Sequence, residues 1–298
     1  MAFYCVPSTE SALISRSSAE TLSVTFYSAE TATDEDSQSV TLGIVDATGA
    51  TVVAAGTAAT RSGTGVYGYT LAGQADLASL TITWAGTFSS NAMSFVTQTE
   101  IVGGFYTTPA EVRSLESLSG EASAYPTADL VSAITWATEV IDNYTGTSFV
   151  YRYHRDVLDG TDNADLKLSN LFPQTVLSGS IAGTALTAAQ IANLNKYRSG
   201  VIRLKDDAWT YTNPGGQVIV NYEAGVSKTP APDIAWAART LSRFYALELK
   251  NRIPSNAISI TNEFGNVSLA QPGMNKPTPL PDVNTVLNRH RHRAPVMF

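Results

Sequence analysis

Cysteine, histidine and charged residues are all scarce in this chain of 298 residues. Its single cysteine, Cys5, excludes an internal disulfide framework. With only three histidines, the chain has almost no ligands for a Cys/His zinc site. Charged residues make up 15% of the sequence, against about a quarter in typical globular proteins. We therefore expect neither a metal site nor a cofactor.

Long apolar runs are absent as well. No stretch of 18 apolar residues occurs, so the sequence predicts no membrane-spanning helix. The first residues lack a basic region followed by an apolar core, which predicts that there is no secretory signal. We expect a protein that is made and assembled in a bacterial cytoplasm.

The net charge of −7 is unevenly distributed along the chain. Up to Gly104 there are nine acidic residues and two basic ones, which leaves seventeen of each sign (26 − 9 and 19 − 2) in the remainder. An acidic chain is a poor candidate for wrapping nucleic acid, because phosphate binding requires clustered lysine and arginine. The one basic cluster runs from Arg289 to Arg293.

The first 102 residues alternate apolar and polar side chains in short runs bounded by turn residues, as β-strands do. The runs are residues 22–27, 40–45, 51–53, 66–71, 80–84 and 93–102. Strands at this spacing predict an immunoglobulin-like sandwich as a domain over residues 1–102. Gly63, Gly65 and Gly68 match the spacing of a dinucleotide-binding loop, but they precede a strand rather than a helix, which favours a turn.

The Gly-Gly pair at 103 and 104 marks the predicted start of a second domain, residues 103–298. Capping signals and apolar residues at helical spacing predict helices over about 108–118, 127–145, 232–252 and 281–291. Between the second and third helices, alternating runs predict a β insertion over about 149–222. We therefore expect a multidomain chain whose second part is an α+β, mainly helical core with a β insertion.

The acidic run from Asp159 to Asp165 invites a calcium-binding interpretation. The EF-hand loop requires glycine at its sixth place and glutamate at its twelfth. Counted from Asp159, these places hold Ala164 and Asn170, so the run is better explained as a polar turn between strands.

The histidines offer little chemistry. His154 lies in a predicted strand, and the sequence contains no G-x-S-x-G nucleophile elbow to pair with it. His290 and His292 alternate with arginines and would point to different faces of a helix, which disfavours joint metal binding. We therefore predict no catalytic residue. The run from Arg289 to Arg293 is explained either as positive charge at the C-terminal end of the last helix or as part of a docking tail, residues 289–298, for an acidic partner or phosphate, and a merely solvated tail is the alternative.

Two stretches near the end carry a resemblance to a known family. Residues 252–273, RIPSNAISITNEFGNVSLAQPG, and residues 280–289, LPDVNTVLNR, resemble head-to-tail adaptor (connector, head-completion) proteins of long-tailed bacteriophages, in particular those of phages that infect actinobacteria. The order of two helices, a β insertion, a long helix and a last helix is similar too. In that group a β-sandwich often precedes the adaptor core.

The resemblance implies a structural virion protein without enzymatic activity, located in the neck at the portal vertex. Its subunits would form a ring, usually of twelve, between the portal protein and a stopper or tail-terminator protein. Genomic DNA would pass through the ring without sequence-specific binding. In relatives the C-terminal segment reaches the portal.

Carried onto this chain, the resemblance assigns two sets of residues. Portal docking falls on Val283, Leu287, Arg289, His290, Arg291, His292, Arg293, Val296 and Phe298. Packing within the ring falls on the long helix, through Ile234, Ala238, Leu241, Tyr245 and Leu249.

Two other functions compete with this one. Tyr67, Tyr69 and Trp84 would suit a carbohydrate- or host-surface-binding module that uses the predicted sandwich. Tyr67 and Tyr69 share one face of a strand, so this alternative requires that face to be exposed. A hydrolase using His154 and a nearby acid is the third possibility.

Overall fold

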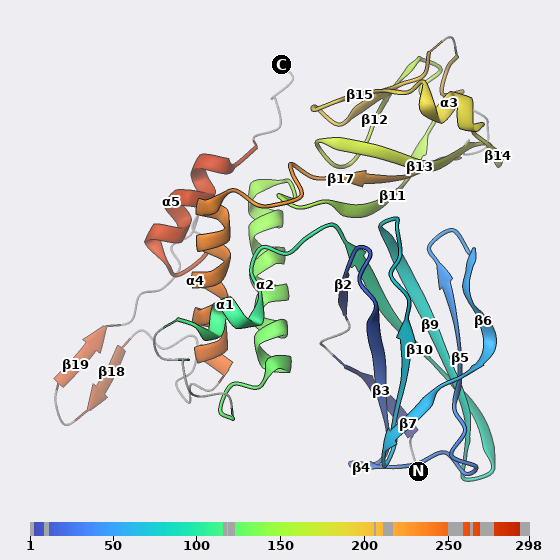
Figure 1. Ribbon diagram of the computed structural model, residues 1–298. Helices are drawn as coiled ribbons and strands as arrows, with labels where there is room; N and C mark the ends of the chain where they lie inside the picture. Colours follow the sequence, from blue (N-terminus) through green and yellow to red (C-terminus); the bar gives the residue numbers. More distant parts are fainter. Residues whose placement is uncertain are drawn as a thin grey trace. The chain divides into compact units, whose positions relative to one another are not determined.

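The computed structural model describes residues 3–8, 12–115, 118, 123–205, 207–210, 217–249, 259–262, 265–268 and 277–292 (Figure 1). The chain forms two compact units. Unit 1 comprises residues 1–104 and 151–225, and unit 2 comprises residues 105–150 and 226–298. Both units are therefore discontinuous in sequence. The predicted domains, 1–102 and 103–298, stay a prediction, because compactness alone does not say which segments fold independently.

The first part of unit 1 contains two β-sheets. One has the order β1-β3-β8-β7 with β4 beside β3, and its strands are β1 (Phe3–Pro7), β3 (Glu20–Ser28), β8 (Val66–Leu71), β7 (Thr60–Gly63) and β4 (Thr31–Ala32). The other has the order β2-β10-β9-β5-β6, and its strands are β2 (Leu13–Ser15), β10 (Asn91–Val102), β9 (Ala78–Phe88), β5 (Thr41–Asp46) and β6 (Thr51–Ala58). Alternate side chains of both sheets form a common core around Phe26, Tyr67 and Trp84.

An acidic loop between β4 and β5 is fixed by its own carboxylates. Glu35 is buried, and its carboxylate accepts hydrogen bonds from the backbone N–H groups of Ser37, Ser39 and Thr87 at 2.9, 2.7 and 3.0 Å. Burial alone would raise the pKa of Glu35, but these hydrogen bonds outweigh it and lower the pKa. The side-chain hydrogen bond from Arg61 is the main reason why the pKa of Asp34 falls to about 2.

The second part of unit 1 holds two further sheets and a short helix. Strands β11 (Arg152–Asp159), β17 (Gln217–Ala224), β13 (Pro173–Ile181) and β14 (Thr184–Ala185) pair in that order. Strands β12 (Asp165–Lys167), β16 (Val201–Arg203) and β15 (Asn195–Tyr197) form the other sheet, and α3 spans Ala188–Ala192. These elements enclose a separate core that contains the fully buried Trp209 and Tyr222.

The expectation of a mainly helical core is wrong, because the chain is mostly β. Helical periodicity locates the helices, and the alternating runs over residues 149–222 predict an insertion in a helical domain. They form two sheets with a hydrophobic core of their own instead, and they cluster with residues 1–104 rather than with the helices. Burying alternate residues of these strands requires a facing layer, so such a segment builds its own core.

The two parts of unit 1 meet around the Gly-Gly pair. The Gly103 N–H donates to the Tyr151 carbonyl at 2.8 Å, and a Cβ at Gly103 would lie 2.7 Å from the Tyr151 Cβ. Arg152 binds the Glu100 carboxylate through Nε and Nη2 at 2.8 and 2.6 Å, and Arg16 pairs with Glu223. The glycine that marks the predicted boundary is thus also required for close packing.

Unit 2 contains helices α1 (Pro109–Arg113), α2 (Thr127–Thr145), α4 (Pro232–Leu249) and α5 (Pro281–His290), with the hairpin β18 (Ser259–Asn262) and β19 (Gly265–Ser268). Thr108 and Glu111 form a capping box at the start of α1. Gly146 ends α2 in the left-handed conformation at φ 74°. The predicted helix 127–145 matches α2, whereas α1 ends earlier than predicted, at Arg113.

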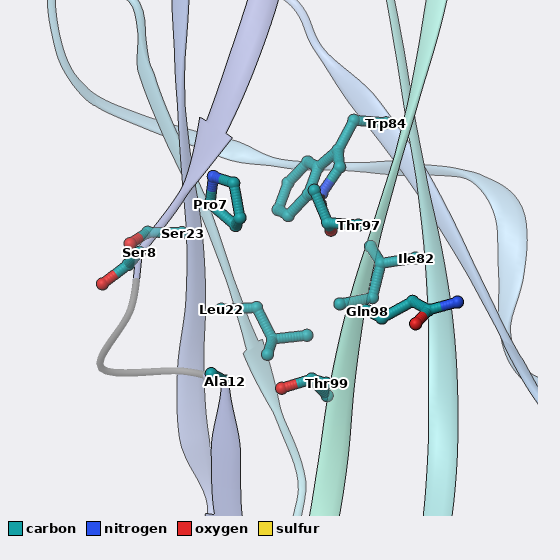
Figure 2. A pocket seen from close by; sticks show the side chains of 10 residues that line it. All are labelled: Pro7, Ser8, Ala12, Leu22, Ser23, Ile82, Trp84, Thr97, Gln98 and Thr99. Carbon is teal, nitrogen blue, oxygen red and sulfur yellow. Dashed lines mark hydrogen bonds between the residues drawn. The ribbon is translucent and has the colours of Figure 1, made fainter. Parts of the chain in front are cut away.

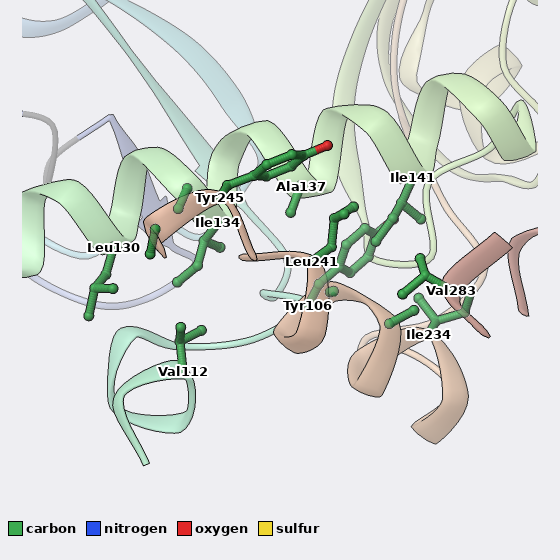
Figure 3. Packing of buried hydrophobic residues seen from close by; sticks show 14 of the residues in the cluster. Tyr106, Val112, Leu130, Ile134, Ala137, Ile141, Ile234, Leu241, Tyr245 and Val283 are labelled. Carbon is green, nitrogen blue, oxygen red and sulfur yellow. The ribbon is translucent and has the colours of Figure 1, made fainter. Parts of the chain in front are cut away.

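The apolar stripes of α2 and α4 face one another and form the core of unit 2. Figure 3 shows Ile134, Ala137 and Ile141 of α2 directed toward this core. Val112 of α1 and Tyr106 join them. The Tyr106 hydroxyl donates to Asp142 and accepts the Phe149 N–H at 2.6 Å, which joins both ends of this segment of unit 2.

Candidate functional site

Helix α5 returns the end of the chain to the α2–α4 pair. Its side chains Val283 and Leu287, one turn apart, are fully buried in the core of unit 2. Figure 3 shows Val283 close to Ile234 of α4 and Ile141 of α2. The last helix is therefore an integral part of this core, and not an appendage.

A buried asparagine fixes the entry into α5. The Asn284 side-chain oxygen accepts from the Thr278 N–H and hydroxyl at 3.1 and 2.8 Å, and its amide donates to the Thr278 carbonyl at 2.7 Å. Because Asn284 is 5% exposed, these bonds satisfy a polar group that would otherwise be costly to bury. The segment before α5 is held to the helix that it enters.

The basic end of α5 meets the acidic start of α4. The His290 Nε2 lies 2.7 Å from the Asp233 carboxylate, and Arg289 Nη1 lies 3.5 Å from it. Burial alone would raise the pKa of Asp233, but the hydrogen bond and charge of His290 outweigh burial and lower it. The pairing suits both helices, since an acid belongs at an N-terminus and a base at a C-terminus. The His290 ring also meets Phe149 edge-on at 5.5 Å.

The residues after α5 lie against the C-terminal end of α2. The Arg291 guanidinium stacks over the Tyr144 ring at 4.9 Å, and the Tyr144 hydroxyl donates to Asn288 at 2.5 Å. The His292 N–H donates to the Thr145 carbonyl at 2.9 Å, which satisfies one of the free carbonyls of that helix end. The described chain is thus fixed as far as His292.

The predicted portal-docking residues fall into three groups. Val283 and Leu287 face the interior of their own subunit. Arg289, His290, Arg291 and His292 come together at the joint of α5 with α2 and α4. Arg293, Val296 and Phe298 lie outside the described residues. Docking to a portal stays a prediction for all of them.

The predicted ring-packing residues divide in a similar way. Ile234, Ala238, Leu241 and Tyr245 are buried in the core of unit 2. Leu249 is 60% exposed at the end of α4. Packing between subunits stays a prediction, and these contacts are within one subunit.

Leu249 lines an apolar groove between α2 and α4. The groove has a volume of about 260 Å³ and is lined by Ser132, Ala133, Trp136, Tyr245, Glu248 and Leu249. Trp136 is 45% exposed and meets Tyr245 edge to face. Trp236 of α4 is another exposed tryptophan, at 38%. The exposure of Trp136 and Trp236 could have been predicted from the sequence, because each is a large apolar residue that lies outside the buried stripe of its helix.

The aromatic residues that suggested sugar binding lie in the sandwich. Tyr67 and Trp84 are almost fully buried, and Tyr69 packs against the same core. The Trp84 Nε1–H donates to Thr97 at 3.0 Å. A pocket of about 110 Å³ lies beside Trp84, with Leu22, Ile82 and Thr97 on its walls (Figure 2). The aromatic faces themselves are therefore not presented to a sugar.

His154 lies half-buried in β11, with its ring 5.6 Å from that of Tyr222. Burial, followed by the charge of Arg152, lowers the pKa of His154 to about 4. The acid on the same face of the strand, Asp156, accepts the Tyr222 hydroxyl at 2.9 Å and the Ser169 N–H at 2.7 Å. This acid serves a buried hydrogen-bond network.

The acidic run after β11 has a structural partner. Asp165 forms two hydrogen bonds with Arg203 across the β12–β16 pair, at 2.5 and 2.6 Å. Within the described residues, no three side chains of the metal-binding types come together. None of the helices described here is long and apolar enough to cross a membrane.

Comparison with known proteins gave matches to solved structures alone. No family model matches the chain, and no curated protein does. A chain in the neck of an empty gene transfer agent particle, computed with C6 symmetry, is 19% identical over 62% of this chain and 89% of its own, with a TM-score of 0.44. A chain in the neck of the native particle, computed with C12 symmetry, is 18% identical over 62% and 91%, with a TM-score of 0.40. A chain in the virion of the native particle is 20% identical over 62% and 89%, with a TM-score of 0.41.

Proposed function

We propose that this chain is a structural, non-enzymatic protein of a virion neck, where it joins a DNA-filled head to a tail. In this proposal twelve subunits form a ring between a portal protein and a stopper or tail-terminator protein. Genomic DNA passes through the ring. The proposal rests on the resemblance of residues 252–273 and 280–289 to phage adaptors, and on the arrangement of unit 2.

The observation that carries the proposal is the way in which α5 closes on α2 and α4. The resemblance includes the order of a long helix, an extended segment and a last helix. In unit 2 the last helix packs on the other two through Val283 and Leu287, and His290 fastens it to Asp233. In this proposal the joint anchors the start of the C-terminal segment in its own subunit.

The charge distribution is compatible with a DNA channel. The chain has a net charge of −7, and residues after Gly104 carry seventeen acidic and seventeen basic residues. A basic surplus would hold phosphates and make passage salt-dependent, whereas a balanced surface does not.

In the proposed ring, contacts between subunits would use side chains of α4 that are not buried in the core of unit 2. Ile234, Ala238 and Leu241 are already occupied within the subunit, so the outward side of α4 with Trp236 is the part available to a neighbour. Such a contact is heterologous, which means that different surfaces of two subunits meet. The ring closes when the rotation between neighbouring subunits is a whole fraction of a full turn.

The mass of the purified protein, alone and mixed with portal, tests the proposal. We expect a closed ring on the portal, seen by native mass spectrometry and electron microscopy. Trp236→Ala should reduce ring formation, while Thr285→Ala, an exposed change on α5, should leave it intact. A protein that stays monomeric and does not bind any portal of a tailed particle would contradict the proposal.

A further inference from the structure

The groove between α2 and α4 is an apolar hollow without a described partner. Trp136 of α2 and Leu249 of α4, 45% and 60% exposed, line the groove together with the buried Tyr245. Exposed apolar side chains that occur singly are ordinary, but a hollow lined by an aromatic pair and a leucine is typical of a binding site. The groove has space for a few apolar side chains at about 260 Å³.

A partly exposed stripe on α2 leads from this groove to the end of the chain. Trp136, Val140 and Tyr144 follow at four-residue spacing, so they form a continuous row on the helix surface. From Trp136 to Tyr144 the row covers about 12 Å at 1.5 Å per residue. At the C-terminal end of this row, the Arg291 guanidinium lies over the Tyr144 ring.

The chain is fixed at that end of the stripe. His292 is bound to the Thr145 carbonyl, and residues 293–298, Arg-Ala-Pro-Val-Met-Phe, follow it. Six residues in extended form reach about 20 Å, which exceeds the length of the stripe. The last three, Val296 to Phe298, are apolar and follow a basic stretch.

We propose that Val296 to Phe298 bind in the groove of their own subunit, after the chain turns back along the Tyr144–Val140–Trp136 row. The chemistry fits, since Phe298 offers a ring to Trp136 and Tyr245, and the thioether of Met297 makes favourable contacts with aromatic rings. The anchoring of Arg291 and His292 raises the local concentration of the tail at its own groove, which favours it over a free partner.

The contact would be weak enough to be released. Ordering several tail residues offsets most of what burial of three side chains gains. This inference does not depend on a role in a virion neck. If the tail also docks to a portal, the groove would hold it until that partner arrives.

Disulfide trapping tests the proposal on the full chain. The variant carries Cys5→Ser, which removes the only native thiol, together with Ser132→Cys in the groove and one cysteine added after Phe298. The matched control replaces Ser132→Cys by Glu139→Cys, an exposed position on α2 that does not line the groove. Under oxidised glutathione we expect the groove pair to form an intramolecular disulfide at least about tenfold faster than the control, given the effective concentration of a short tether.

Three results would overturn the proposal. Equal rates for the two pairs would place the tail elsewhere, and disulfide-linked dimers would assign the groove to a second copy. The third result concerns the exposure of Trp136. If the proposal is correct, deletion of residues 294–298 increases acrylamide quenching of tryptophan fluorescence, and Trp136→Phe abolishes that increase. Quenching that is unchanged by the deletion, in a chain with native circular dichroism, would show that the groove was already open. Portal binding is read separately, so either proposal can fail alone.

Discussion

Leu287→Ala tests whether α5 belongs to the cooperative core of unit 2. Leu287 is 0% exposed and packs with α2 and α4, so the change removes buried apolar atoms and leaves a cavity. Such substitutions cost about 2–5 kcal/mol, depending on how far the site collapses. This corresponds to a change of about thirty- to several-thousandfold in the opening equilibrium.

Hydrogen exchange measured by mass spectrometry shows which helices lose protection when Leu287→Ala lowers the stability. If α5 and the α2–α4 pair open together, protection should fall in Pro281–His290, Thr127–Thr145 and Pro232–Leu249 to a similar extent. The strands of unit 1 have their own cores and should exchange as in the unmodified chain. The comparison is internal, so it does not require the whole chain to unfold in a single transition.

Thr285→Ala is the matched control, because Thr285 lies on the exposed side of the same helix. Its effect should stay within about 0.5 kcal/mol, as for most surface substitutions. Faster exchange in α5 alone, with α2 and α4 unchanged, would refute the reasoning. It would mean that the last helix is a detachable tail despite its burial.

Three further predictions concern unit 1. Gly103→Ala should destabilise it by about 1–3 kcal/mol, because the new methyl group meets Tyr151 at 2.7 Å, whereas Gly63→Ala, with its nearest neighbour at 3.8 Å, should cost far less in thermal unfolding. His154 should titrate in NMR with a midpoint near its lowered pKa of about 4. Because this pKa lies below the usual histidine value of about 6.5, the unfolded chain takes up the proton first, and the contribution of His154 to stability is lost as pH falls from about 6.5 to 4. His154→Gln should therefore flatten that part of the pH–stability curve. Glu35→Gln should cost about 1–3 kcal/mol, since one amide oxygen replaces a carboxylate that accepts three backbone N–H bonds. Because the pKa of Glu35 is lowered, its contribution to the free energy of unfolding is present above the pH range in which a carboxyl group normally titrates. The difference in stability between Glu35→Gln and the unmodified chain should therefore shrink as pH falls below that range.

Local signals in the sequence were sufficient for most helices and many strands. The periodic apolar row and the terminal glycine of α2 predicted Thr127–Thr145 at both ends. The stripe of α4 placed Ile234, Leu241 and Tyr245 on one face, and all three are buried. Such features depend on neighbours in sequence, so periodicity reveals them.

The grouping of these elements depends on contacts between distant residues, and no local pattern encodes them. Arg152 pairs with Glu100, 52 residues away, and Arg16 pairs with Glu223, 207 residues away. These pairs join the strands after α2 to the first strands of the chain. Portal docking stays a prediction for Val283 and Leu287, and the core that covers them within the subunit comes from two distant helices.

The same contacts determine how a truncation of the first 102 residues has to be interpreted. It would remove Glu100 and Arg16, the partners of Arg152 and Glu223, and expose the apolar ring faces of Tyr151 and Tyr153 that pack on the sandwich core. A failure of that truncated chain to assemble would then report a damaged unit 1, and would not show that the sandwich binds a neighbour. A shorter change is more informative, because deleting residues 293–298 removes no described contact and leaves α5 in place. A role of the tail in assembly therefore has to be read from that deletion.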